Sequence, residues 1–460
     1  MKAMTYEEFL KSKQRIIKPS GFDCIPENKC LFDFQRDIAR WALKKGKAAI
    51  FLDTGLGKTI IQLSWADEIC KHTNSKVLIL APLAVSGQTI REGEKFGIRA
   101  NACRSQIDVK DGINITNYEM LHHFNINKFA GVILDESSII KSFSGKTTQQ
   151  MLDLFKFTEY KLACTATPAP NDYEELGNHA EFLGVMSRSE MLATFFVHDS
   201  GDTAKWRLKG HAETEFWKWI ASWAMVVKNP EDLGYDGSKY KLPKLNIQTH
   251  FVESSNTKGM FIVLPAQTLA ERREARKESL ESRVKKTAKL VQDMDNCLIW
   301  CDYNDESTAL TKAIPGAVEV KGSDTPEYKE NSLIGFATGE VKYLVTKPKI
   351  AGFGMNWQNC NNIIFCGLSD SYERFYQAIR RCYRFGQTKE VNVHVIISEK
   401  EESVLENIKR KEELAQKMSR NMVALTSEIL KNEIQNTTRN VIDYNPQYEI
   451  EIPVWLKEVI

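Results

Sequence analysis

The sequence predicts an α/β protein with two tandem lobes, each a parallel β-sheet flanked by helices. Three observations support this prediction. Apolar runs typical of buried strands alternate with amphipathic stretches over residues 30–170, and the alternation begins again at Cys297. A glycine-rich loop joins the first of these strands to a helix. Residues 229–244 are rich in turn-forming residues and indicate a linker between the two halves.

Bulk composition excludes little. The 460 residues suffice for two or three domains, and 42% of them are hydrophobic and 27% charged. The formal net charge is +2, so any nucleic-acid-binding surface must come from local clustering of charge. No apolar run reaches the roughly 18 residues that a membrane span needs, and the N-terminus lacks the apolar core of a signal peptide. We therefore expect a cytoplasmic protein with no membrane partner.

Cysteine and histidine usage does not indicate a metal or disulfide site. The ten cysteines are scattered without a C-x-x-C pair, and the eight histidines show no ligand spacing. Several cysteines, such as Cys297 and Cys366, lie inside apolar runs. We expect reduced core thiols rather than a disulfide framework or a zinc site.

The first half is organised around the stretch Ala48 to Thr59, AAIFLDTGLGKT. An apolar strand leads into a glycine turn, and Lys58 opens an amphipathic helix. This order predicts a phosphate cradle with an accompanying Mg²⁺ ion. Lys58 would reach the β- and γ-phosphates, and the Thr59 hydroxyl would ligate Mg²⁺. The loop residues that would hold phosphate are Thr54, Gly55, Leu56 and Gly57.

Two adjacent carboxylates, Asp135 and Glu136, end the predicted strand in GVILDESS. Carboxylates that follow an apolar run are costly unless a cation or a reaction uses them. Asp135 would hold Mg²⁺ through its outer sphere, and Glu136 would polarise an attacking water. The alternative is an acidic N-cap of the next helix. Another strand ends at Thr165 and Thr167, whose hydroxyls would sense the γ-phosphate.

Other polar stretches of the first half surround this predicted loop. Gln35 precedes it, and its amide could read an adenine edge with a paired donor and acceptor, although alone it would be a surface glutamine. Residues 83–88, LAVSGQ, are predicted as a polar turn, and a short strand follows within residues 112–121.

The remaining domain limits follow from composition. The N-terminal lobe is predicted at residues 1–228, with an aromatic helical insert at about 185–228 whose stripe we interpret as core. A charged helix follows at 268–292, and two interpretations stay open: a solvated helix with i,i+4 ion pairs, or a surface that binds a nucleic-acid backbone. The second lobe is predicted at 245–400 and a helical tail at 401–460.

The second half repeats the strand pattern of the first. Its predicted strands lie at residues 297–301, 317–320, 342–346, 362–366 and 391–397. Between them, Gly352 and Gly354 suit close backbone approach. Arg381 and Arg384 lie one helical turn apart in QAIRRCYRFGQ. With a phosphate loop in the partner lobe, we expect these arginines to reach across a cleft to the transferring phosphoryl group.

A series of short stretches in fixed order resembles the two-lobed helicase-like ATPases of superfamily two (the DEAD/DEAH-box type), and among them the Swi/Snf-type DNA translocases. The stretches are DTGLGKT, LILAPLAV, ITNYEM, LDESS, TATPAPN, CLIWCDYN, IAGFGMNWQ and QAIRRCYRFGQ. The last matches the family pattern Q-A-x-x-R-x-x-R-x-G-Q. The resemblance covers about residues 30–400, and the compact chain is similar to the small phage and bacterial forms.

The resemblance implies two RecA-like lobes with ATP and Mg²⁺ in the cleft between them. Lys58, Glu136, Arg381 and Arg384 would be catalytic, the arginines acting as fingers, and Gln377 would help to bind the nucleotide. Duplex DNA would lie across both lobes without base-specific contacts. The turns expected to touch it contain Ser86, Thr116, Asn117, Gly352, Gly354 and Asn356.

The chain departs from the family pattern at three places. Leu52 replaces the first glycine of the phosphate loop, and Ser138 occupies the fourth position of the acidic motif, where the family usually has histidine. Residues 348–350 form an apparent insertion before the glycines of the fifth motif.

The predicted function is an ATP-driven motor on duplex DNA, in a prokaryotic cell or phage-infected host and associated with the nucleoid. One alternative is a strand-separating helicase that acts on single-stranded DNA or RNA. Another is an ATP-gated DNA clamp that recruits a protein partner such as a nuclease or methyltransferase. The complete set of predicted hydrolytic residues argues against the clamp.

Overall fold

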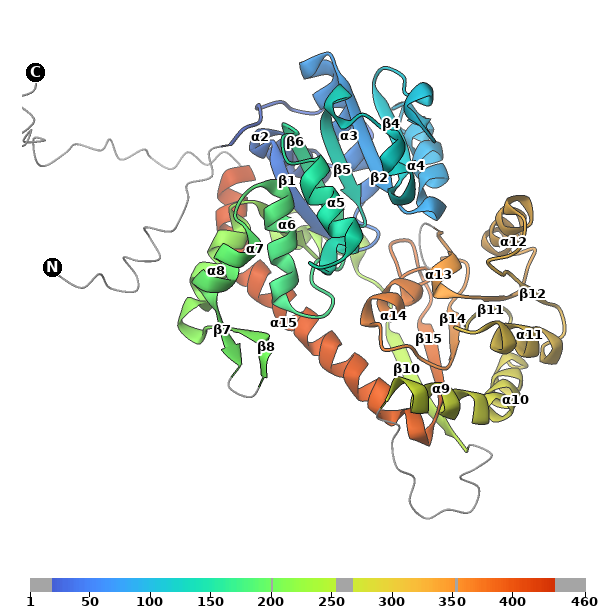
Figure 1. Cartoon of the computed structure of the whole chain (residues 1–460). Helices are drawn as coiled ribbons and strands as arrows, with labels where there is room; N and C mark the ends of the chain where they lie inside the picture. Colours follow the sequence, from blue (N-terminus) through green and yellow to red (C-terminus); the bar gives the residue numbers. More distant parts are fainter. Residues whose placement is uncertain (1–18, 200–201, 254–267, 352–354, 435–460) are drawn as a thin grey trace, which may run out of the picture.

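The computed structural model describes residues 19–199, 202–253, 268–351 and 355–434. In this part of the chain, two parallel β-sheets form the centres of two α/β lobes (Figure 1). The long helix α15 (Glu402–Ile434) starts beside the second lobe and packs against the first (Figure 1). The predicted fold class, two α/β lobes built on parallel sheets, is confirmed. The predicted tail beyond residue 434 lies outside the described residues.

The first sheet has the strand order β3-β4-β2-β5-β6-β1-β9 in the described residues, and every pair is parallel. Helices cover both faces, so the central strands are buried on both sides. The strands are β1 (Lys47–Leu52), β2 (Lys76–Ala81), β3 (Ala100–Ala102), β4 (Ile113–Asn117), β5 (Phe129–Asp135), β6 (Tyr160–Thr165) and β9 (Ala224–Val227). The helices are α2 (Asp33–Lys45), α3 (Lys58–Thr73), α4 (Leu83–Lys95), α5 (Lys146–Leu154), α6 (Leu176–Leu183), α7 (Arg188–Phe195) and α8 (Glu213–Ala221).

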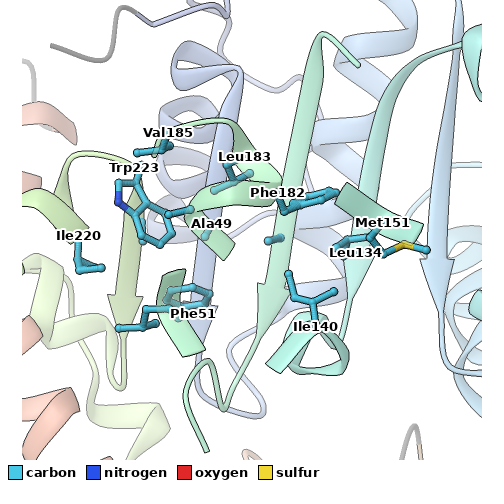
Figure 2. Close-up of a cluster of buried hydrophobic side chains, with 14 of the residues drawn as sticks. Ala49, Phe51, Leu134, Ile140, Met151, Phe182, Leu183, Val185, Ile220 and Trp223 are labelled. Atoms are coloured by element: carbon cyan, nitrogen blue, oxygen red, sulfur yellow. The ribbon is translucent and has the colours of Figure 1, made fainter. Parts of the chain in front are cut away.

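Alternate residues of β1 divide the core of this lobe. Ile50 and Leu52 pack with the apolar faces of α2 and α3, while Ala49 and Phe51 point to the opposite face. Figure 2 shows that opposite face, where Phe51 lies near Trp223, with ring centroids 6.4 Å apart. The aromatic stripe that contains Trp223 is buried, which confirms its interpretation as core.

The second sheet has the order β10-β15-β14-β11-β13-β12 in the described residues and is also parallel throughout. Its strands are β10 (Leu245–Val252), β11 (Cys297–Trp300), β12 (Ala317–Glu319), β13 (Tyr343–Thr346), β14 (Asn362–Cys366) and β15 (Val391–Ser398). Its helices are α9 (Leu269–Glu278), α10 (Leu280–Val291), α11 (Asn304–Ala313), α12 (Pro326–Thr338), α13 (Pro348–Ala351) and α14 (Tyr372–Ile379). The ten cysteines of both lobes are free thiols. No helix among the described residues is long and apolar enough to cross a membrane.

Two predictions about the first lobe were wrong. Residues 83–88 form the start of α4 rather than a turn, and Val85 and Ile90 of this helix pack on the core. The aromatic insert is not wholly helical. It contains an antiparallel hairpin of β7 (Phe196–Asp199) and β8 (Asp202–Leu208), and it ends in β9, which pairs with β1. The chain leaves the helix at Ser222, so Val227 belongs to a buried edge strand.

The predicted charged helix is two helices, α9 and α10, which meet at Ser279. The sequence leaves open a solvated helix with i,i+4 ion pairs and a surface that binds a nucleic-acid backbone. The two most buried arginines of these helices fit neither interpretation. Arg283 is fully buried and donates to Glu306 at 2.9 Å and to the Cys366 carbonyl at 2.7 Å. Arg276 donates to the same carboxylate at 2.8 Å. Although burial opposes it, the two guanidinium groups lower the pKa of Glu306.

This buried network predicts a large loss of stability when one partner is removed. Replacing Arg283→Ala would leave Glu306 buried with half of its compensating charge, so we expect a loss of about 3–5 kcal/mol in the second lobe. Native-state hydrogen exchange of the β14 amides measures this locally. The exposed Arg273→Ala, on α9, is the matched control and should change the same free energy by less than about 0.5 kcal/mol. Equal effects of the two variants would contradict the structural role of the network.

Candidate active site

The predicted phosphate loop connects β1 to α3 at the edge of the first sheet that faces the second lobe. Two glycines are required there. Gly57 has φ 84°, and a Cβ on it would lie 2.2 Å from Gln35 Nε2. Gly55 has φ 90°, and a Cβ on it would lie 2.9 Å from the Cβ of Phe385, a residue of the second lobe. The loop is therefore closely covered from both sides.

Lys58 is the first residue of α3 and points back under the loop. Its ammonium donates to the Leu52 carbonyl at 2.8 Å and to the Asp53 carbonyl at 3.4 Å. Burial lowers its pKa, against the influence of Glu136, Asp53 and Asp135. Two backbone carbonyls therefore hold the Lys58 ammonium, and three carboxylates lie near it. From this position the lysine can exchange its bonds to the carbonyls for bonds to a phosphate.

The acidic pair lies at the end of β5, two strands away from β1 in the sheet. Gln62 of α3 donates to Asp135 at 2.8 Å, and the Tyr118 hydroxyl donates to the Asp135 carbonyl at 2.7 Å. Glu136 has φ 53°, a left-handed conformation that is uncommon for a residue with a side chain. Burial raises the pKa of Glu136 to about 6, while Lys58 and Arg381 oppose the shift.

Two threonines, Thr165 at the end of β6 and Thr167 just after it, connect to this pair. The Thr165 hydroxyl donates to Glu136 at 3.3 Å and accepts the Thr167 N–H at 3.1 Å. The Thr167 hydroxyl is buried without a hydrogen-bond partner in the described structure. Two hydrogen bonds therefore connect the Thr167 backbone to the Glu136 carboxylate.

Gln35 lies on α2 and is buried, not on the surface. Its amide oxygen accepts the Phe32 N–H at 3.0 Å, and its amide nitrogen donates to the Leu56 carbonyl at 3.0 Å. Each functional group of the amide therefore has one partner in the protein. The second N–H of the nitrogen and the second lone pair of the oxygen are the groups with which Gln35 would read an adenine edge.

The arginines of the second lobe follow α14. They do not share a helix face as predicted, because α14 ends at Ile379 and the segment after it is a series of turns. Arg381 donates to the Gln377 carbonyl at 3.0 Å and to the Met355 carbonyl at 3.3 Å. Burial lowers the pKa of Arg381. Burial and the positive charge of Arg381 together lower the pKa of Arg384 to about 10.

Three polar groups of this segment have no partner in the described structure although they are buried: the amide oxygen and nitrogen of Gln377 and the Nε of Arg384. Buried polar groups without partners are rare and cost free energy. Their presence here, opposite the phosphate loop, is consistent with a polar ligand between the lobes.

The structure shows a direct connection between the acidic motif and the second lobe that sequence reasoning missed. The Ser138 hydroxyl donates to Glu373 of α14 at 2.5 Å, and the Lys141 ammonium pairs with the same carboxylate. Ser138 thus makes an interlobe contact from the fourth position of the motif. Glu373 gave no signal in the sequence because its partner lies 235 residues away.

The residues predicted to touch DNA are less uniform. Thr116 is only 3% exposed, and Asn117 accepts the Met120 N–H at 3.1 Å as the cap of a short helical turn. Asn356 is exposed, and Ser86 is half-buried on α4. Gly352 and Gly354 lie outside the described residues. The burial of Thr116 argues against a contact between its side chain and DNA. Ser86, Asn117 and Asn356 stay candidates for DNA contacts.

An Mg²⁺ ion would find hard oxygen donors in this site, which suit its chemistry. Thr59 at the start of α3 and Asp135 at the end of β5 are the candidates. Burial raises the pKa of Asp135, while the hydrogen bond from Gln62 and the charge of Lys58 oppose the shift. No group of three His, Cys, Asp or Glu side chains within the described ranges could hold a metal ion. The ion would therefore rely on phosphate and water for its other ligands.

Two family models match the chain. The SNF2-related domain matches residues 34–196, and the helicase conserved C-terminal domain matches residues 282–386. Together they cover the phosphate loop, the acidic pair and both arginines. The chain belongs to the SNF2-related helicases of superfamily two. It is a nucleic-acid-dependent ATPase of the ATP-dependent helicase class.

Two individual proteins are similar over most of their length. An uncharacterized ATP-dependent helicase of Bacillus subtilis (strain 168), YqhH, is 23% identical over 483 residues, covering 91% of this chain and 85% of its own. The SWI2/SNF2 ATPase core of Sulfolobus solfataricus, solved in complex with double-stranded DNA, is 19% identical. It covers 91% of this chain and 99% of its own, with a TM-score of 0.41.

Gln62, which sequence reasoning also missed, generates a prediction about the metal. Its donation to Asp135 fixes the carboxylate, and removing such a support typically weakens metal binding 10–100-fold. We expect Gln62→Leu to raise the Mg²⁺ concentration needed for half-maximal ATP hydrolysis about tenfold. The control is Gln149→Leu, an exposed glutamine of α5. An unchanged Mg²⁺ requirement in a folded Gln62 variant would contradict the assignment of Asp135 to the metal.

Proposed function

We propose that this ATPase is a motor that moves along duplex DNA. The observation that carries the proposal is the split of the hydrolytic groups between the lobes. Lys58 and Glu136 come from the first lobe, while Arg381 and Arg384 come from the second. The charges of Arg381 and Glu136 already influence each other across the cleft. Such a site is complete only when the lobes close, so hydrolysis and lobe movement are coupled.

In the proposed mechanism each group has a separate task. The phosphate loop, through the backbone of Thr54 to Gly57, and the Lys58 ammonium bind the β- and γ-phosphates. Thr59 and Asp135 would hold Mg²⁺, which supplies charge neutralisation when bound. Glu136 orients and polarises the attacking water. Arg381 turns from the Gln377 and Met355 carbonyls to the phosphoryl group. Arg384 approaches the same group, and Gln377 supports the nucleotide.

Release of the γ-phosphate would then be communicated by short paths. Thr165 and Thr167 would carry the signal, because their hydrogen bonds lead to Glu136. Glu373 of α14 connects the acidic motif to the second lobe. Opening and closing of the cleft would let each lobe in turn hold the DNA backbone.

The proposed DNA contacts are to the phosphate backbone. The proposed positions are surface residues near Ser86, Asn117 and Asn356. Because the net charge of the whole chain is only +2, the positive charge that attracts the phosphates must be clustered locally. Binding through phosphates carries no sequence information and weakens steeply with salt. We therefore propose binding to duplex DNA of any sequence.

Steady-state ATP hydrolysis measured without nucleic acid and with blunt duplex DNA, single-stranded DNA or RNA tests this proposal. Lys58→Ala serves as the blank. Strong stimulation by blunt duplex is the expected result. Stimulation by single strands alone would indicate a strand-separating helicase instead, and turnover that no nucleic acid changes would contradict both motor functions.

The two sides of the cleft should fail differently when mutated. Lys58→Ala should abolish or strongly weaken use of ATP, because the lysine binds phosphate. Arg381→Ala should leave nucleotide binding intact and lower turnover by about 10³-fold, because an arginine finger acts in the transition state. Binding of a fluorescent ATP analogue and kcat separate the two effects. Loss of nucleotide binding in a folded Arg381 variant would overturn the finger assignment.

A further inference from the structure

A second set of interlobe contacts meets the phosphate loop from the other side. Asp53, the residue directly after β1, forms an ion pair with Arg380 and accepts a hydrogen bond from the Tyr376 hydroxyl. Both partners belong to the second lobe, at α14 and the turn after it. Asp53 is only 8% exposed, so the pair is largely removed from water. Neither role is part of the family pattern, and Arg380 occupies one of its variable positions.

The surroundings favour this pair in its ionised form. The Arg380 guanidinium lies 5.2 Å from the ring centroid of Tyr376 and 5.4 Å from that of Tyr383, at cation–π distance. Although burial opposes it, the charge of Arg380 and then that of Lys228 lower the pKa of Asp53 to about 2. The pair borders a cavity of about 430 Å³ between β10, α14 and α15.

Asp53 is also part of the phosphate loop. Its carboxylate accepts the Thr54 N–H at 2.6 Å, and its carbonyl accepts from the Lys58 ammonium at 3.4 Å. One residue therefore contacts the loop backbone, the phosphate-binding lysine and the second lobe. Arg380 immediately precedes Arg381 in the chain. Its ion pair with Asp53 therefore fixes the start of the segment that carries Arg381 and Arg384.

We propose that Asp53 and Arg380 form an interlobe latch that positions Arg381 and Arg384 over the phosphate loop. Arg380 is a positioning residue that acts through Arg381 and Arg384 and does not touch the phosphates. The latch engages when the lobes close and makes the closed, hydrolytic arrangement more stable than the open one. This inference rests on the proposed finger roles of Arg381 and Arg384, which Arg381→Ala tests separately.

The latch predicts a separation of turnover from binding. We expect Arg380→Gln to lower kcat at least tenfold, because removing one member of a buried charge pair disfavours the closed state strongly. Binding of a fluorescent ATP analogue should change less than threefold, because Lys58 and the loop remain. Asp53→Asn should give the same pattern, since its amide oxygen can still accept the Thr54 N–H. Tyr376→Phe should lower kcat less than either, because the ion pair remains.

A double-variant cycle decides whether the two residues act as one unit. Asp53→Asn combined with Arg380→Gln should be no more than about twofold slower than the slower single variant, because the first change already releases the latch. It also leaves no unpaired buried charge, which protects folding. Arg380→Lys keeps the charge and should recover part of kcat.

The control is Arg374→Gln on the same helix, whose side chain makes no ion pair in the described structure; its kcat should stay within twofold of the parent. All rates are measured with the nucleic acid that stimulates the parent most, so the outcome does not depend on which nucleic acid that is. Unchanged kcat in Arg380→Gln, losses that multiply in the double variant, or a loss explained by weaker ATP binding would each overturn the latch.

Discussion

Helix α14 of the second lobe is held against two loops of the first lobe by buried charged contacts, and the arrangement of the active site depends on them. Its first turn presents Glu373 to Ser138 of the acidic motif and to Lys141 beyond it. Its last turn and the residues beyond present Tyr376 and Arg380 to Asp53, at the start of the phosphate loop. One short helix thus contacts the loops that carry both Lys58 and Glu136. Moving α14 must affect the phosphate-binding and the water-activating groups together.

The charges in the cleft are stabilised poorly by the protein alone. Burial lowers the pKa of Lys58 and of Arg381 and raises that of Glu136 to about 6, so burial disfavours the ionised form of each group. A triphosphate with its metal would bring charges of both signs into this space and compensate them. The buried, unpartnered amide of Gln377 and Nε of Arg384 have the same explanation. A bound nucleotide would offset the cost of burying these groups and so favour closure of the lobes around it.

Much of this architecture could be predicted because local sequence determines it. The glycine turn, the apolar strands and the acidic pair each have a short-range physical cause. The structure places Gly55, Lys58 and Glu136 at the same edge of the first sheet, after β1 and β5, as expected. What sequence reasoning missed depends on distant partners. Asp53 and Arg380 are 327 residues apart in the sequence, and no periodicity of the local sequence predicts that they form a pair. The errors at 83–88 and at β9 have a related cause, since Ser and Gly in α4 and a four-residue apolar strand give weak local signals that tertiary packing overrides.

The position of α15 adds a mechanical element. Met418 and Met422 of this helix pack in the core of the first lobe, while its beginning lies against the second, so the helix spans both sides of the cleft (Figure 1). Lobe movement must therefore be accommodated by this helix as well as by α14.

We propose that ATP hydrolysis in this cleft drives movement along duplex DNA. Displacement of a triplex-forming strand from a duplex tests it most directly, because a moving protein removes the third strand without separating the other two. We expect displacement that requires ATP and disappears in Glu136→Gln. Duplex-stimulated ATP hydrolysis without any displacement of the third strand would contradict it.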